Sequence, residues 1–326
     1  MNSLYIGPYR QVDNLGILSR LYLQDFASIS SKMMSRPVYL NMHPKFLGGQ
    51  LDSENNIENL DTIIQNLPID MLVSDYKKTN IAIPIISNKR FSPKDIAKLN
   101  KFNYVLVDDP CAYEELSSNL NVNVFFIKPN ISYEKIKLAA GNKRFNLGIH
   151  NHYKKVYLVA DYSSNVDLID TIILQFSSLL SKHRNLSLVL FLSGIDQQTS
   201  SLLESKIRTI YEKFSLRTDT MHIIMIASEL DEESHVVAHN TGDIFLNLND
   251  FPRNSLNFYL AEALNKPVLD LSDIDKCVIN YRNNTYSEDG INIADPCSLS
   301  HYMARAISNN SHTENFKSQY IKDIIK

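Results

Sequence analysis

A strand that leads into a helix with an open start is the feature of this sequence best suited to chemistry. Residues 243–248 (DIFLNL) are an apolar run of strand length, and a polar turn containing a proline follows them. Apolar residues recur at helical spacing from Asn254 onward. The amides of Ser255, Leu256 and Asn257 would open this helix without intrahelical partners. Such amides bind phosphate oxygens, so the sequence predicts a phosphate site here.

The elements around this turn place it at an edge where ligands bind. Lys266 and Pro267 end the helix, and residues 268–271 form a second buried strand. A strand–helix–strand unit makes a right-handed crossover in a parallel sheet, and open parallel sheets bind ligands at the carboxyl ends of their strands. Arg253 lies in the same turn, where its guanidinium could grip phosphate oxygens in two places. An ordinary surface charge is an equally good interpretation of Arg253.

The chain begins with a similar strand, loop and helix. Residues 3–6 are a predicted strand, the loop at 7–16 (GPYRQVDNLG) has a glycine at each end, and the helix after it has one apolar face. The loop is either a surface connection or part of a ligand site at the carboxyl edge of a first sheet. In the second case Arg10 and Arg20 could reach a bound phosphate group.

A histidine follows the next predicted strand, at residues 37–41. A single histidine after a strand is usually an ordinary loop residue. The position of His43 at the carboxyl end of that strand keeps it as a candidate for acceptor binding or catalysis.

Strands and helices alternate through both halves of the chain, which predicts two parallel sheets. We expect domains at 1–130 and 154–326, joined by a polar linker at 131–153. Strands are also expected at 70–73, 80–86, 104–107, 122–127, 156–160, 186–192 and 221–226. Helices are expected at 55–67, after Ser92, after Asp109, and at 166–180, 200–214, 231–240, 298–308 and 313–325.

Composition describes an ordinary water-soluble chain. The 326 residues are 44% hydrophobic and 21% charged, and the net charge of −3 argues against a protein that coats nucleic acid. Three scattered cysteines, no signal peptide and no apolar run long enough to span a bilayer predict a cytoplasmic protein. No P-loop, dinucleotide fingerprint, nucleophile elbow or metal-ligand motif is present, so no metal site is predicted.

The 243–270 stretch resembles the signature of GT-B glycosyltransferases, in particular the retaining family-4 type. The sequence AEA around Glu262 and the dipeptide Pro267-Val268 match that signature. Asn254 stands where the family has its first glutamate, and residues 255–257 stand where it has a glycine-rich turn. The resemblance implies that Glu262 binds the donor ribose and that the helix start holds the donor diphosphate.

The opening loop also resembles the N-terminal loop of many GT-B enzymes, which lies near the donor phosphates and the acceptor. Arg10 and Gly16 match that loop in type, whereas Asn14 replaces a more usual glycine. By the same resemblance the donor base lies against the residues after a strand of the second domain, here Ser228 and Leu230. The family commonly has an arginine and a lysine after the first strand of that domain, and residues 161–165 contain neither.

The resemblance implies an α/β protein with two Rossmann-like domains facing across a cleft, and terminal helices that cross back to the first domain. It implies a glycosyltransferase that is retaining and metal-independent, with no cofactor beyond a nucleotide-diphosphate sugar. His43, Arg253 and Asn254 are its candidate catalytic residues. The acceptor is a glycan, a protein, a small molecule or modified DNA, and homo-oligomerisation is left open.

Three departures from the family pattern favour an alternative function. They are Asn254, the turn at 255–257 and the absence of the basic pair in 161–165. A GT-B protein that has lost catalysis and serves as a binding or structural subunit would show such departures. Lysines in the first half of the chain would suit an anionic acceptor, although ordinary solvated lysines explain them as well.

Overall fold

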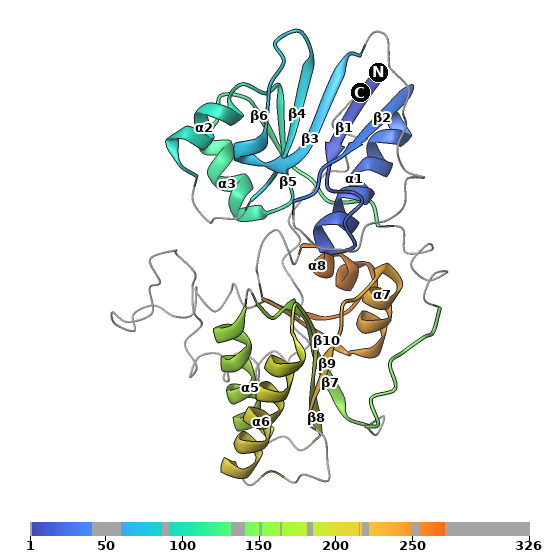
Figure 1. Cartoon of the computed structure of the whole chain (residues 1–326), viewed down its shortest axis with the longest axis vertical. Coiled ribbons are helices and arrows are strands. Elements are labelled where there is room, and N and C mark those ends of the chain that lie inside the picture. The colour runs from blue at the N-terminus through green and yellow to red at the C-terminus, as the bar shows by residue number, and fades with distance from the viewer. Residues whose placement is uncertain are drawn as a thin grey trace. The chain divides into compact units, whose positions relative to one another are not determined.

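The computed structural model describes residues 2–40, 60–86, 91–131, 141–149, 152–163, 165–180, 185–214, 216, 222–248 and 255–270. The chain divides into two compact units, each with its own parallel sheet (Figure 1). Unit 1 comprises Met1–Ile131, Asp250–Tyr259 and Asn315–Lys326, and unit 2 comprises Ser132–Asn249 and Leu260–Glu314. The candidates His43, Arg253 and Asn254 and the expected terminal helices lie outside the described residues.

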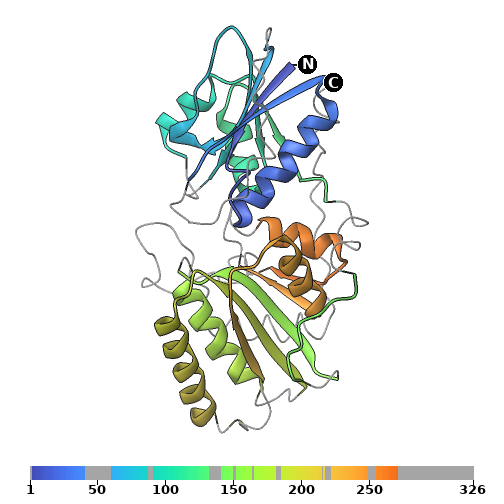
Figure 2. The same ribbon diagram turned by 45° about the vertical axis from the view of Figure 1, so that its right-hand side comes forward.

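Unit 1 contains a six-stranded sheet with the strand order β2-β1-β3-β4-β5-β6, and every pairing in it is parallel. Its strands are β1 (Asn2–Gly7), β2 (Lys32–Pro37), β3 (Thr62–Pro68), β4 (Thr79–Ile85), β5 (Tyr104–Val107) and β6 (Asn123–Phe126). Helix α1 (Asn14–Ile29) packs on one face, and α2 (Pro93–Leu99) and α3 (Pro110–Asn119) pack on the other (Figure 2). The sheet is therefore covered on both sides, as parallel sheets are.

Local sequence explains where the helices of unit 1 begin. The side chain of Asp13 accepts a hydrogen bond from the Gly16 amide and caps α1. Ser92 and Asp95 form a reciprocal capping box at the start of α2, with a proline in the first turn. The predicted helix starts after Ser92 and Asp109 are both confirmed.

Three predictions in unit 1 are wrong. Residues 62–67 lie in the strand β3 rather than in a helix, and residues 69–71 form the short 3-10 helix η2 (Ile69–Met71) rather than part of a strand. The strand expected at 37–41 lies earlier in the chain, because β2 begins at Lys32 and ends at Pro37.

Two buried amides in β3 account for the first error. Gln65 and Asn66 look like the polar face of a helix, yet their side chains are only 3% and 6% exposed. The Gln65 carboxamide exchanges two hydrogen bonds with the backbone of Val73, and the Asn66 amide donates to the carbonyl of Ile83. Partners of this kind allow polar side chains inside a strand, and periodicity cannot show them.

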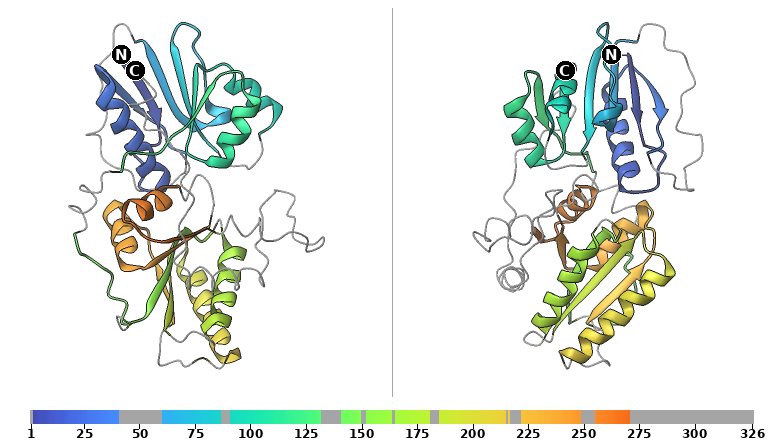
Figure 3. Two further views of the ribbon diagram at one scale, coloured as in Figure 1. Left: turned by 180° about the vertical axis from the view of Figure 1, so that it is seen from behind. Right: turned by 60° about the vertical axis from the view of Figure 1, so that its left-hand side comes forward.

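Unit 2 contains a five-stranded parallel sheet with the order β11-β10-β7-β8-β9. Its strands are β7 (Lys154–Asp161), β8 (Leu186–Ser193), β9 (Ile223–Ala227), β10 (Ile244–Asn247) and β11 (Val268–Asp270). Helices α5 (Val166–Leu180) and α6 (Gln197–Lys213) lie side by side on one face (Figure 3). A right-handed crossover places α7 (Glu232–Thr241) on the opposite face. Helix α8 (Ser255–Ala263) is divided between the units, because its residues up to Tyr259 belong to unit 1 and those from Leu260 onward belong to unit 2.

The apolar runs of the second half are confirmed as these elements. Strand β8 is buried along nearly its whole length, and α5 has the predicted bounds. Part of the predicted linker packs on unit 2 itself. The ring of Phe145 lies 5.3 Å from that of Phe191, and its amide donates to the Thr241 hydroxyl at 2.8 Å. Among the described residues, no helix has the length and apolar character needed to cross a membrane.

Candidate functional site

Each sheet has one place where its strand order reverses, and ligands bind open α/β sheets at such places. In unit 1 the reversal lies between β1 and β3, beside the loop that follows Gly7. In unit 2 it lies between β7 and β10, beside Asp161 and Asn247. The predicted site residues that the structure describes follow these strand ends or neighbouring ones.

Helix α8 begins after β10, as predicted, with Ser255 as its first residue. Leu256 and Asn257 are fully buried, at 1% and 0% exposure. Glu262 is exposed. It lies seven residues after Ser255, a spacing that returns to the same helical face. The helix therefore presents its first amides and one carboxylate along a single side.

The other end of α8 is closed by its own backbone. Asn265 has a positive φ of 52°, and the amides of Asn265 and Lys266 donate to the carbonyls of Glu262 and Ala261, both at 2.9 Å. This is the Schellman arrangement, with asparagine in the position that glycine usually fills. The Lys266 ammonium donates to the carbonyl of Gly242 at 2.7 Å, and burial lowers its pKa. Its charge therefore lies away from the helix start.

The predicted base-binding residues follow β9. Ser228 is exposed, and its amide donates to the carbonyl of Leu192 at 3.0 Å, whereas Leu230 is half-buried. Between them, a carboxylate oxygen of Glu229 accepts from the amide of Gly194 at 3.1 Å. Gly194 has a positive φ of 65°, which suits glycine at this tight turn after β8.

A second carboxylate stands at the end of β7. Asp161 accepts from the Ser163 hydroxyl at 2.5 Å. A Cβ atom added to Gly194 would lie 2.8 Å from the other oxygen of Asp161, so the absence of a side chain at Gly194 leaves room for this carboxylate. The described residues that directly follow β7, β8, β9 and β10 include neither lysine nor arginine. The described edge therefore carries negative charge where the family resemblance implies positive charge.

Asn247, the last residue of β10, adds an uncharged acceptor to this edge. Its side chain is 3% exposed, and its Oδ1 atom accepts no hydrogen bond from the part of the chain that the structure describes. Ile244 and Phe245 pair with Val156 and Tyr157 of β7, so Asn247 projects from the same face of the sheet as Asp161. A buried polar atom without a partner is rare and points to a bound group or water.

Sequence reasoning missed these three acceptors in unit 2. Asp161, Glu229 and Asn247 belong to three separated segments, and only the strand order brings their strand ends to one edge. The available signal was that each lies close to the end of a predicted strand. Such positions meet at the carboxyl edge of a parallel sheet.

In unit 1 the opening loop is held by its own helix. The Arg20 guanidinium donates to the carbonyls of Tyr9 and Gln11 at 2.9 and 2.7 Å. A Cβ atom on Gly16 would lie 2.0 Å from the Gln11 carbonyl oxygen, and the Gly16 amide already donates to Asp13 at 2.9 Å. Through these contacts Gly16 and Arg20 fix the conformation of the loop.

Arg10 lies in the same loop and is partly buried. One of its terminal nitrogens donates to the hydroxyl of Tyr39 at 3.2 Å. The contact connects the loop to the segment after β2. It does not test the predicted role of Arg10 at the donor, which stays a prediction.

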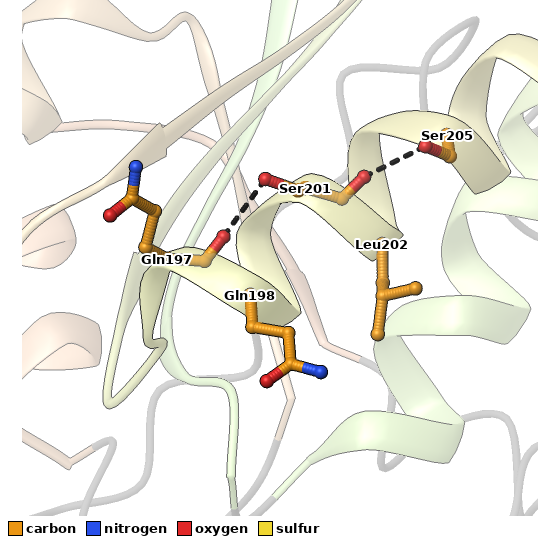
Figure 4. Close-up of a pocket in the computed structure, with 5 residues that line it drawn as sticks. All are labelled: Gln197, Gln198, Ser201, Leu202 and Ser205. Atoms are coloured by element: carbon orange, nitrogen blue, oxygen red, sulfur yellow. Dashed lines mark hydrogen bonds between the residues drawn. The ribbon is translucent and has the colours of Figure 1, made fainter.

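A shallow hollow of about 550 Å³ lies on the outer surface of α6 (Figure 4). The hydroxyls of Ser201 and Ser205 each donate to a backbone carbonyl one turn earlier in the same helix. The lining has no titratable side chain, so we assign no chemistry to it. It is formed by Gln197, Gln198, Ser201, Leu202 and Ser205.

No protein-family model matches the sequence, and no curated protein matches it. Solved structures do match. A structure described as trehalose-6-phosphate from E. coli bound with UDP-2-fluoro glucose is 10% identical, with a TM-score of 0.58 over 94% of this chain and 92% of that chain. Sucrose-phosphate synthase from Thermosynechococcus elongatus is 11% identical, with a TM-score of 0.57 over 95% and 90%.

The N-terminal domain of Candida albicans trehalose-6-phosphate phosphatase is 10% identical, with a TM-score of 0.55 over 94% of this chain and 89% of that one. The chain spans less of other matches, namely 49% of a chain in the Glycosylation Associate Protein complex from Streptococcus agalactiae and 65% of the OtsA apo structure. Identities this low establish a fold and no activity. The chain has the GT-B type of fold, with two Rossmann-like domains that each contain a parallel sheet.

Proposed function

We propose that this chain is a glycosyltransferase that binds a nucleotide-diphosphate sugar at helix α8 and transfers the sugar to an acceptor with retention of configuration. The observation that carries the proposal is helix α8. It begins after β10, at the strand-order reversal of a Rossmann-like sheet, and exposes Glu262 on the same face as its first residue. Amides and dipole at a helix start favour a phosphate group.

The residues divide the work of holding the donor. The amides of Ser255, Leu256 and Asn257 hold the diphosphate, and the Glu262 carboxylate accepts hydrogen bonds from ribose hydroxyls. The backbone around Ser228 and Leu230 lies against the base. Negative charge grows on the leaving diphosphate in the transition state, and the fixed dipole at the helix start stabilises it.

We also propose roles for residues of unit 1 and for residues outside the described part of the chain. Arg253 and Asn254 precede α8 in the sequence and would act at the diphosphate. Gly16 and Arg10 belong to the loop proposed to approach the donor, and His43 would act on the acceptor. The acceptor is a glycan, a protein, a small molecule or modified DNA.

Nucleotide binding tests the proposal. Purified wild type is titrated calorimetrically with UDP, GDP, ADP, dTDP and CDP and with their common sugars. We expect one nucleotide to bind, and Glu262→Ala to weaken it about tenfold or more, which is 1.4 kcal/mol or more. The control is Glu212→Ala, which removes an exposed carboxylate on α6. Failure of every nucleotide to bind at millimolar concentration would refute the proposal.

The acidic edge favours a second candidate, a GT-B protein without catalysis that serves as a binding or structural subunit. Asp161 stands where the family resemblance implies a basic pair, and Arg20 binds its own loop. The two candidates are distinguished by incubating the protein with the nucleotide sugar that it binds and following the nucleotide sugar by chromatography. Release of nucleotide with sugar transfer or hydrolysis excludes the second, whereas an intact donor after saturation excludes the first.

A further inference from the structure

A buried tyrosine connects the first half of helix α8 to the strand ends of unit 1. The residues of α8 up to Tyr259 belong to that unit, and Tyr259 is 6% exposed. Its hydroxyl donates to the carbonyl of Asp108 at 3.0 Å, with the carbonyl of Ile127 as a second, longer acceptor at 3.4 Å. Asp108 follows β5 and Ile127 follows β6, so the hydroxyl contacts the backbone where two adjacent strands end.

The two carbonyls that receive this hydroxyl are themselves held in place. The amide of Ile127 donates to the carbonyl of Val107 at 2.8 Å, which joins the two strand ends. The hydroxyl of Tyr22, on α1, donates to the carboxylate of Asp108 at 2.9 Å. Burial and the neighbouring Asp108 carboxylate raise the pKa of Tyr22 well above its usual value, so this hydroxyl stays a donor. The acceptor for Tyr259 is therefore a fixed point of unit 1.

The hydroxyl of Tyr259 adds direction to the packing of α8. Leu256 and Leu260 are buried, and a phenylalanine ring at position 259 would fill the same apolar surroundings. Apolar packing has no preferred direction, whereas a hydrogen bond weakens steeply when its angle changes. Tyr259 lies four residues, about one helical turn, after Ser255. A bond that fixes Tyr259 therefore also fixes the amides of the first turn.

We propose that Tyr259 is a positioning residue of the donor site, which fixes the amides of 255–257 where they meet the diphosphate. The inference rests on the proposed function, because that function assigns these amides to the diphosphate. Tyr259 is buried and acts through the helix rather than on the ligand. Dipoles stabilise developing charge best when they are held in place beforehand, and a displacement of about 1 Å can slow a reaction about a hundredfold.

One substitution and a matched control test the proposal. Tyr259→Phe removes the hydroxyl and keeps the ring. Tyr5→Phe is the control, because the buried Tyr5 hydroxyl also donates to a backbone carbonyl at 3.0 Å, that of Ser19 on α1. Both variants should lower the melting temperature to a similar degree, since each leaves a buried carbonyl without a donor. Only Tyr259→Phe should weaken binding of the nucleoside diphosphate that wild type binds, by about fivefold or more.

The loss of affinity should concern the phosphate groups. The nucleoside diphosphate and monophosphate of the same base are titrated calorimetrically into wild type and both variants. We expect the preference for the diphosphate to fall about fivefold in Tyr259→Phe and to stay at its wild-type value in Tyr5→Phe. An unchanged preference in Tyr259→Phe overturns the inference and leaves the proposed function standing. Failure of wild type to bind any nucleotide overturns both.

Hydrogen exchange without ligand gives a readout that does not depend on nucleotide affinity. The amides of residues 259–263 are the ones that hydrogen bonds within α8 protect. We expect these amides to exchange about fivefold faster in Tyr259→Phe and at the wild-type rate in Tyr5→Phe. Equal exchange of α8 in both variants shows that the hydroxyl does not fix the helix, and it overturns the assignment of Tyr259.

Discussion

The carboxyl edges of the two sheets use their polar groups in opposite ways. In unit 1, Arg20 binds the carbonyls of its own loop, and Asp13 binds the amide of Gly16. In unit 2, Asp161 and Glu229 face one glycine, and the amide oxygen of Asn247 lacks a partner among the described residues. The first edge is organised around its own backbone, whereas the second presents acceptors that a ligand can complete.

This difference shows why a strand–loop–helix pattern alone does not define a site. The sequence predicted a phosphate site at the start of the helix at 255–257, and it left the opening loop as either a surface connection or part of a ligand site to which Arg10 and Arg20 could contribute. In the structure, one terminal nitrogen of Arg20 donates to two carbonyl oxygens of its own loop at 2.7 and 2.9 Å. The following variants test the contrast, from the largest expected effect to the smallest.

Gly16→Ala should destabilise the protein most. The new Cβ atom would lie 2.0 Å from the Gln11 carbonyl oxygen, so the loop or the start of α1 must move. We expect a loss of about 3 kcal/mol in the free energy of unfolding, measured by urea denaturation. Ser28→Ala, on the exposed side of α1, is the control. Wild-type stability in Gly16→Ala would show that the close approach is not required.

Arg20→Ala separates a loop-shaping role from a phosphate-binding role. Removing two charge-assisted hydrogen bonds should cost about 2 kcal/mol of unfolding free energy, because the two carbonyls lose their donor. Nucleotide affinity, measured by calorimetry on the folded variant, should stay within about twofold of wild type. A tenfold loss of affinity with wild-type stability would place Arg20 at the ligand and break the contrast between the two edges.

Asp231→Ala tests an acidic residue of unit 2 whose role is structural. Asp231 caps α7, and hydrogen bonds from Ser234 hold its pKa below the usual value. A depressed pKa gives stability that is present above the unfolded value, about 4, and lost as pH falls through the folded value. We expect the variant to lose about 1 kcal/mol of unfolding free energy at pH 7 and less in acid, as measured by thermal denaturation. A loss of stability that is constant from pH 7 to pH 3 would contradict the capping role.

Asn265→Gly should have the smallest effect, and it should be stabilising. Asn265 has a φ of 52° at the end of α8, a conformation that glycine adopts without steric cost. We expect the free energy of unfolding, measured by thermal denaturation, to rise by about 0.5 kcal/mol, and nucleotide affinity to stay unchanged. Asn265→Ala is the matched variant and should lose stability. If both variants behave alike, the helix end does not depend on that conformation.

Much of the fold could be predicted from the sequence because both sheets are parallel and buried. Continuous apolar runs such as 186–192 can only be interior strands, and the spacing in 166–180 fits one helix. Strand β3 could not be predicted, since Gln65 and Asn66 are buried by hydrogen bonds to Val73 and Ile83. Those partners come from later segments of the chain.

The candidate site was predictable only where its residues are consecutive. The start of α8 and Glu262 follow from one stretch of sequence, and the structure places that helix after β10. The acceptors Asp161, Glu229 and Asn247 come from three different strand ends. Their common position depends on strand order and register, which the sequence does not state.

The most direct test of the proposed donor site is hydrogen–deuterium exchange with and without a saturating nucleotide diphosphate. Backbone amides at the start of α8 should bind the phosphate groups and exchange more slowly. We predict protection in peptides that cover Ser255, Leu256 and Asn257, with Glu262→Ala reducing it at the same nucleotide concentration. Protection confined to other segments, with the start of α8 unchanged, would contradict the assignment of the donor site.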